Sequence, residues 1–378
     1  RSYFLCDADD WLGYAHVSSA GEPDGPERFF ERAYQRLRGR QWSTRERPVG
    51  AALLQVCASR PCIAIRASYG DGGLEVGVRP TQECFVDLQS ISEQARRDCR
   101  RFDETKRPPD SAVRWAELAG RLAGQLRLDN LLRDLASRGA PVGCPILVET
   151  HGNGLHLPWC GLLAETIARP DAVLVSDLDV DRTCTSAAAG AGDLVLALNC
   201  FTTDDPLYAI FTQLAGHVGT THVPCADRKA FRSALEAHPA RLIFTGAHGG
   251  QRGILHKLSL SIGAERADAI EVWQGVRLPR AAVVVGFTCY GGGGESQATG
   301  EFGSIASLAL RAGARAAVAS RWPAWTDRHY KELLTALAAS VLDPDDWRLA
   351  ADVMRFVRAT RGAGLWNSLG WGVYVPSR

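Results

Sequence analysis

The 378-residue sequence contains little lysine: its four lysines leave arginine to supply almost all of the 43 positive charges. The net charge is only +1, so the composition gives no general attraction to nucleic acid or to anionic lipid. No uninterrupted apolar run approaches the ~18–20 residues that cross a bilayer, and no signal-peptide pattern opens the chain. We therefore expect no direct nucleic-acid partner and no membrane partner.

The sequence also lacks CxxC pairs, although it has 11 cysteines spread from Cys6 to Cys289. An odd number without paired spacing argues against a disulfide framework and against a zinc site, and it indicates the cytoplasm, where thiols stay reduced. Most such cysteines behave as small buried hydrophobic residues. We expect no metal, and the surroundings of each cysteine must identify a reactive one.

Residues 1–140 have a mixed pattern that predicts an α+β domain. Two runs rich in β-branched residues within 62–79 flank a glycine-rich turn, which predicts a β-hairpin. Residues 89–107 are heavily charged and run into a Pro-Pro pair, which predicts an exposed helix followed by a break. Leucines at helical spacing across 111–138 predict one or two amphipathic helices.

From residue 141 on, short apolar runs alternate with helical patterns, which is typical of an α/β domain. The predicted strands are 145–149, 172–175, 194–198, 241–245, 282–287 and 316–320. The predicted helices are 207–216, 228–237, 302–312 and 327–341. A chain of this length is expected to form two domains.

Two of the predicted strands each deliver a reactive side chain together with glycine. The fourth strand leads to His248 and Gly249, and the fifth leads to Cys289 and then to the glycine run 291–294. In open α/β sheets, chemistry collects at the carboxyl ends of adjacent strands. The matching context of these two segments therefore predicts that the histidine and the cysteine form one site.

The pair suits nucleophilic catalysis by Cys289 with His248 as its base. A free thiol is mostly protonated at pH 7, so a nearby base is needed to form the thiolate. The imidazole can then return the proton to the leaving amine. The backbone N–H groups of Gly249 and Cys289 are the expected donors to the oxyanion.

Each of these features has a second interpretation. Cys289 could be a buried core thiol, and His248 could be a turn histidine satisfied by backbone groups. The glycine run 291–294 could hold a phosphate, as in a nucleotide-binding α/β module. Against this, the Lys-Ser/Thr of a P-loop is missing and Glu295 would repel an anion.

Several segments occur in an order that resembles the CHAT-domain peptidases, bacterial relatives of the caspases and separase. Residues 143–159, which end in Leu-Pro-Trp, are similar to the opening segment of that family. Residues 245–249 and 287–291 are similar to its histidine and cysteine motifs, and 317–323 to its late strand ending in Trp-Pro. The segment 366–374 resembles its closing Trp-rich segment.

The resemblance implies a fold and a domain organisation. The expected architecture is a caspase-like α/β sheet with helices on both faces, in a domain over 141–378. This domain would have two lobes, an inert half over about 141–195 and an active half over 196–378. It would follow the mixed α+β domain of residues 1–140, a possible sensor or docking region for an activating partner.

The resemblance also implies an activity: a cysteine endopeptidase with a Cys/His dyad, no obligatory third residue and no cofactor. It would make limited cuts in a partner protein, which we expect to be co-encoded, in a bacterial defence or cell-death pathway. The alternative is a catalytically silent adaptor that uses the caspase-like fold to bind partner proteins.

The same resemblance suggests substrate-binding residues. Asp327 is similar to an acid that in separase-like relatives lies in the S1 pocket and pairs with a basic P1 side chain; alternatively it caps the following helix, worth about 1 kcal/mol. Glu295 is a weaker candidate for that acid. Ser320, Arg321 and Trp322 are expected along a cleft where a substrate adds as an extended strand.

Overall fold

The computed structural model describes a subset of the chain. It covers residues 2–4, 14–16, 50–58, 63–70, 72–78, 120–152, 157–164, 166, 168–177, 195–217, 220–252, 257–279, 282–289, 291, 304–320, 333, 335–339, 345–362 and 370–376. The exposed helix predicted over the charged stretch 89–107 lies outside these residues.

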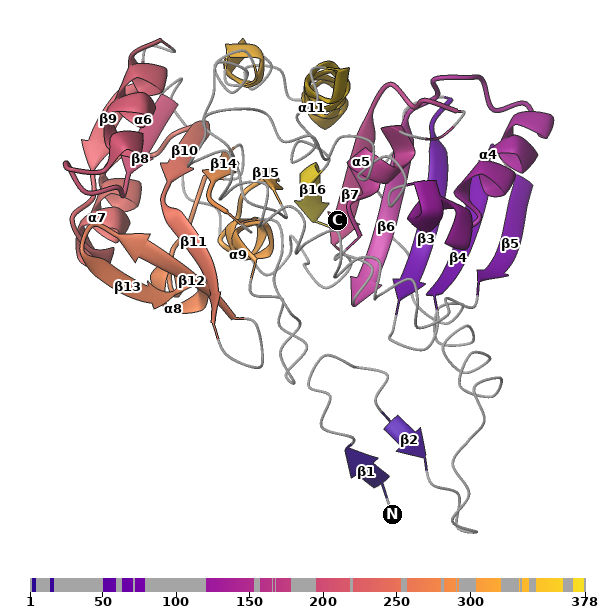
Figure 1. Cartoon of the computed structure of the whole chain (residues 1–378), viewed down its shortest axis with the longest axis horizontal. Helices are drawn as coiled ribbons and strands as arrows, with labels where there is room; N and C mark the ends of the chain where they lie inside the picture. Colours follow the sequence, from indigo (N-terminus) through magenta and orange to yellow (C-terminus); the bar gives the residue numbers. More distant parts are fainter. Residues whose placement is uncertain are drawn as a thin grey trace.

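An 11-stranded sheet organises the molecule, in the order β5-β4-β3-β6-β7-β16-β15-β14-β10-β8-β9 (Figure 1). One half consists of β3 (Ala52–Ala58), β4 (Ile63–Tyr69), β5 (Gly72–Val78), β6 (Ile146–Gly152) and β7 (Val173–Asp177). The other half consists of β8 (Val195–Asn199), β9 (Thr221–Pro224), β10 (Leu242–Gly246), β14 (Val283–Phe287), β15 (Ala316–Ser320) and β16 (Trp371–Pro376).

The parallel strands β3, β6 and β7 of one half run in the opposite direction to β8, β9, β10, β14 and β15 of the other. Strand β16 is antiparallel to β15 but parallel to β7, and all other pairs from β3 through β6 to β7 and from β9 through β15 are parallel. The carboxyl ends of the β8–β10–β14–β15 group therefore lie at the opposite edge from those of β3, β6 and β7. Side chains that follow β10 and β14 meet at one edge, and His151 on β6 lies toward the other.

The central strands are buried along their whole length, which their sequences explain. Every residue of β10, β14, β15 and β16 is buried. Continuous apolar runs such as Val283-Val-Val are typical of parallel strands covered on both faces. The strands end where polar residues and glycine begin, which places the chemistry-bearing side chains at the rim of the sheet.

Helices flank the sheet: α4 (Leu128–Ser137), α5 (Trp159–Ala164), α6 (Pro206–His217), α7 (Arg228–Ala237), α8 (Ala269–Trp273), α9 (Ile305–Arg311) and α11 (Asp346–Gly362). Helix α11 packs on β7, β16 and α5, so it covers the seam between the two halves. Helix α9 packs on β14, β15 and β16. Among the described helices, none has the length and apolar character needed to cross a membrane.

Two smaller sheets complete the described structure. Strands β1 (Ser2–Phe4) and β2 (Tyr14–His16) form an antiparallel pair. Strands β11 (His248–Arg252), β12 (Lys257–Ile262) and β13 (Glu265–Asp268) form an antiparallel sheet directly after β10. The second of these small sheets begins at the predicted catalytic histidine.

The α/β class and all six strands predicted from residue 141 on are confirmed to within three residues at either end. The hairpin predicted within 62–79 also forms, as β4 and β5. Its place is unexpected: β3 pairs in parallel with β6, so these N-terminal strands extend the same sheet. A boundary near residue 140 would cut between hydrogen-bonded neighbours, and the division into domains stays a prediction.

Candidate active site

The register of two neighbouring strands brings the histidine and cysteine segments together. Strands β10 and β14 are parallel, and Gly246 lies opposite Phe287 at their ends. His248 and Cys289 each follow two residues later. Since hydrogen-bonded strands lie about 4.8 Å apart, the two segments leave the sheet side by side, and the Ala247 N–H still donates to the Phe287 carbonyl at 3.4 Å.

Gly249 lies directly against the backbone of Cys289. A Cβ atom built on Gly249 would lie 1.9 Å from the Cys289 carbonyl oxygen and 2.7 Å from Cγ2 of Thr288. No side chain fits in this space, so only glycine allows the two segments to approach so closely. The contact explains why glycine follows the histidine, a requirement that the sequence pattern shows but cannot explain.

The imidazole of His248 is half-exposed, with 50% of its side chain accessible, and it is held from two sides. Its Nε2 atom lies 2.5 Å from Oδ2 of Asp205. Its ring packs edge-on against Phe201, with ring centroids 5.0 Å apart and planes at 76°. With Nε2 facing the carboxylate, Nδ1 is the nitrogen that can serve a thiol. The imidazole is thus held against the Asp205 carboxylate, and the segment that carries it lies beside the cysteine segment.

Asp205 is the residue of this site that the sequence analysis missed. Its Oδ1 atom accepts a hydrogen bond of 2.8 Å from the Leu207 N–H at the start of α6, which leaves Oδ2 for His248. An acid directly before Pro206 at the first helical position is a recognisable helix start. That pattern could have identified Asp205 as a helix cap, but not as a partner of a histidine 43 residues away.

A buried asparagine ties the end of β8 to α6 and so fixes this arrangement. Asn199 donates to the Tyr208 carbonyl and to the Thr212 hydroxyl, both at 3.2 Å, and accepts from the Phe201 N–H at 3.2 Å. His222 lies 3.2 Å from the same amide, and its burial lowers its pKa. The network holds Phe201 in the position where it supports the imidazole.

Cys289 differs in exposure from the other cysteines whose side chains are described. It is partly accessible, whereas Cys144, Cys160, Cys200 and Cys225 are buried. Burial raises the pKa of Cys160 to about 12 and also raises that of Cys144; for Cys200 a hydrogen bond to Cys225 is the larger cause. Thiols that stay protonated are poor nucleophiles, so Cys289 is the best-placed candidate among these five.

The predicted substrate-binding residues fall mostly outside the described part of the chain. Glu295, Arg321, Trp322 and Asp327 all lie there, as do the glycines 292–294. Ser320 ends β15, where it pairs with Trp371, and its side chain is fully buried. It therefore contributes to the sheet and does not present its side chain on a cleft surface.

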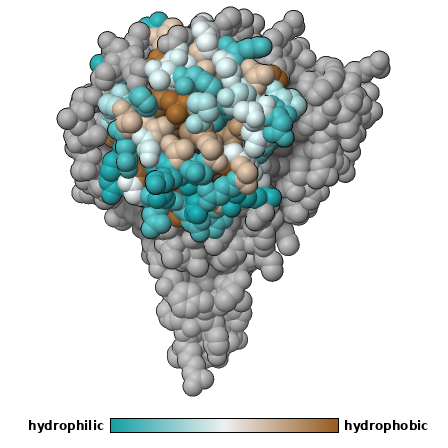
Figure 2. Space-filling model, turned by 90° about the vertical axis from the view of Figure 1, so that its left-hand side faces the viewer, coloured by the Kyte–Doolittle hydropathy of each residue, from teal (hydrophilic) through white to brown (hydrophobic). Residues whose placement is uncertain are grey.

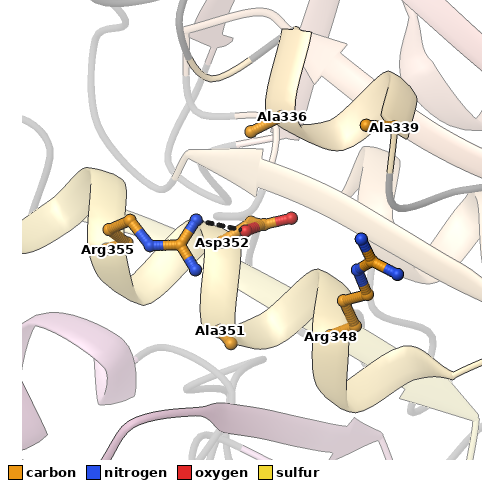
Figure 3. Close-up of a pocket in the computed structure, with 6 residues that line it drawn as sticks. All are labelled: Ala336, Ala339, Arg348, Ala351, Asp352 and Arg355. Atoms are coloured by element: carbon orange, nitrogen blue, oxygen red, sulfur yellow. Dashed lines mark hydrogen bonds and ion pairs between the residues drawn. The ribbon is translucent and has the colours of Figure 1, made fainter.

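A pocket of about 290 Å³ lies away from these residues, between α11 and the helical residues 335–339 (Figure 3). Three alanines form part of its lining, together with Arg348, Asp352 and Arg355. Asp352 and Arg355, three residues apart on α11, form an ion pair of 2.6 Å at its wall. None of the residues predicted for the site lines this pocket. Within the described residues, no cluster of histidine, cysteine and acidic side chains could hold a metal ion.

Comparisons with known proteins place the fold. No protein-family model matches the chain, and no curated protein sequence does. Two crystal structures of the separase–securin complex of Saccharomyces cerevisiae match with TM-scores of 0.52 and 0.54, at 9% and 8% identity. Each match covers 87% of this chain but only 30% of the separase chain. The chain therefore has a caspase-like fold of the separase type.

Proposed function

We propose that the chain is a cysteine endopeptidase related to the CHAT-domain peptidases, with Cys289 as nucleophile and His248 as base. The observation that supports this most is the register-matched exit of the two segments from β10 and β14, with Gly249 against the Cys289 backbone. The separase-like fold is consistent with it. The partial exposure of Cys289 and His248 would give a peptide access to both groups.

The proposed reaction proceeds through a thioester. His248 takes the thiol proton, and the Cys289 sulfur attacks the carbonyl carbon of the substrate. The C–N bond then breaks, the proton passes from the imidazole to the leaving amine, and the acyl group stays on the sulfur. A water molecule, deprotonated by His248, attacks the thioester, the C–S bond breaks, and the thiol is restored. Backbone N–H groups of Gly249 and Cys289 would stabilise the oxyanion in both steps.

Asp205 has a positioning role in this reaction. Its carboxylate favours the imidazole tautomer with the proton on Nε2, which leaves the Nδ1 lone pair for the thiol. The fixed helix start keeps the carboxylate, and hence the ring, in one orientation. The site would then contain a Cys/His/Asp triad in place of the expected dyad.

Replacing Asp205 by asparagine is expected to lower kcat roughly 100-fold, with little change in KM. Asparagine still caps α6 through its oxygen, but its NH₂ group would face Nε2 and force the proton onto Nδ1. Asp227→Asn is the matched control, because Asp227 caps α7 in the same way, with a 2.7 Å bond from the Ala230 N–H. The measurement is steady-state peptide cleavage. Equal kcat values for Asp205→Asn and Asp227→Asn would show that Asp205 has no role in the mechanism.

The finer features of the function follow from the resemblance. We propose limited cuts in one co-encoded partner protein, in bacterial defence or cell death, with residues 1–140 as the docking or sensor region. A basic P1 residue would pair with Asp327. Cleavage after arginine that is unchanged in Asp327→Ala would exclude this pairing.

Incubation of the full chain with a peptide library, followed by mass spectrometry of the products, tests the activity itself. We expect discrete cuts by the wild type and none by Cys289→Ala. A partner-binding adaptor of the same fold would give no cuts with either protein, and that result would overturn the proposed activity.

A further inference from the structure

The three-stranded sheet after β10 presents an open face beside the site. On this sheet His248 lies opposite Ser261, and Ser261 lies opposite Arg266, so the three residues form one row across β11, β12 and β13. Directly opposed residues share a face. The neighbouring row faces the other way, and its residues Leu260 and Ala267 are buried. The His248 row therefore lies on the accessible face.

Arg266 is exposed on this face, and its guanidinium is held in place. Its Nε and Nη2 atoms lie 3.2 and 3.1 Å from the hydroxyl oxygen of Ser259, which itself donates to the Gly250 carbonyl at 2.9 Å. A Cβ atom on Gly250 would lie 2.9 Å from Nη2. The guanidinium therefore covers the backbone of β11 two residues after the imidazole.

No carboxylate of the described residues is paired with this guanidinium, although Asp268 lies two residues further along β13 on the same face, opposite Ser259. Across the part of the chain that the structure describes, Arg266 forms no ion pair, and its anchor is a neutral hydroxyl. On the same sheet Glu265 is paired with Arg228, and near the histidine Asp205 is committed to the imidazole and to α6. Hydrophilic residues are plentiful along the lower edge of the coloured surface in Figure 2. An oriented, exposed cation that forms no ion pair with the described residues is suited to binding a carboxylate.

The proposed chemistry determines which part of a substrate meets this cation. The acyl half of the substrate stays bonded to Cys289, and the leaving amine receives its proton from His248. The residues after the cut bond therefore leave on the His248 side, along the face of the three-stranded sheet that carries Gly250 on β11 and Arg266 on β13. We propose that Arg266 selects substrates with an acidic side chain shortly after the cut bond. This inference rests on the proposed peptidase function.

Internally quenched peptides test this selectivity. They would share one sequence up to a bond that the wild type cuts and carry Glu, Gln or Lys in the two positions after it. We expect the wild type to prefer Glu over Lys in kcat/KM by about five- to tenfold, the size of a partly exposed charge-assisted contact. Arg266→Gln should bring the ratio near one, and Arg266→Glu should invert it.

Two controls separate selectivity from a structural role. The first is a substrate with the same acyl part and a fluorogenic amine as leaving group, whose cleavage should not change in either variant. The second is Arg133→Gln. Arg133 is an exposed arginine on helix α4, which lies beside the other half of the sheet. It should keep the wild-type ratio.

The failures of the two proposals are distinguishable. Cleavage with an unchanged Glu-to-Lys ratio in Arg266→Glu, or an equal loss with every substrate including the fluorogenic amide, would overturn the role of Arg266 alone. Absence of all cleavage by the wild type would overturn the peptidase function and this selectivity with it.

Discussion

Substitution of Gly249 by alanine is expected to reduce kcat for peptide cleavage by about 10²–10³-fold, the usual cost of losing one oxyanion donor. The added methyl group would lie 1.9 Å from the Cys289 carbonyl oxygen, so one of the two backbones must move. Either movement displaces an N–H group proposed for the oxyanion hole. Because the overlap involves backbone on both sides, no side-chain rotation can relieve it.

Gly250→Ala is the matched control for this prediction. Its Cβ would meet the Arg266 guanidinium at 2.9 Å, and the end of a flexible side chain can move aside. With a fluorogenic amide substrate, which carries no residue after the cut bond, we expect this variant to keep near-normal kcat. Comparable activity of Gly249→Ala and wild type would show that this close approach has no part in catalysis.

Substitution of Asp346 by alanine is expected to destabilise the protein by about 3–5 kcal/mol. Asp346 lies in the first turn of α11, 3.3 Å from the Arg315 guanidinium, and their side chains are only 8% and 9% exposed. Removal of the carboxylate leaves a buried cation without this counter-ion. Since α11 covers the seam of the sheet, a lower midpoint of urea unfolding is the expected readout.

Asp352→Ala on the same helix provides the comparison. Asp352 is as buried as Asp346, but its partner Arg355 is 72% exposed and stays solvated when the pair is lost. We expect this change to cost at most about 1 kcal/mol. Equal midpoints of urea unfolding for Asp346→Ala and Asp352→Ala would mean that the burial of Arg315 does not determine how much its ion pair with Asp346 stabilises the protein.

Much of the sheet could be predicted because buried parallel strands have a distinctive sequence. Runs such as 283–287 are apolar without alternation, so their positions and the edge where they meet follow directly. Strands β11 to β13 could not be found in this way. Strands β11 and β13 are short and rich in glycine and charge, and although β12 alternates polar residues with leucine and isoleucine, it does not form a continuous apolar run.

The candidate site was predictable only where chemistry and local sequence coincide. His248, Gly249 and Cys289 follow predicted strands and lie in segments that contain glycine, so the sequence pattern indicates their positions. The carboxylate of Asp205 reaches the imidazole through tertiary packing of α6 on β8 and β9. The joining of β3 to β6 is likewise a long-range pairing, across more than 80 residues, for which no local pattern exists.

Alkylation of the folded chain by iodoacetamide, with site mapping by mass spectrometry, tests the central claim most directly. If His248 activates Cys289, the wild type should be modified at Cys289 first, with buried Cys160 protected, and His248→Ala should slow the modification of Cys289 at least about tenfold. Equal rates in the two proteins, or a Cys289 that resists modification as Cys160 does, would contradict the account.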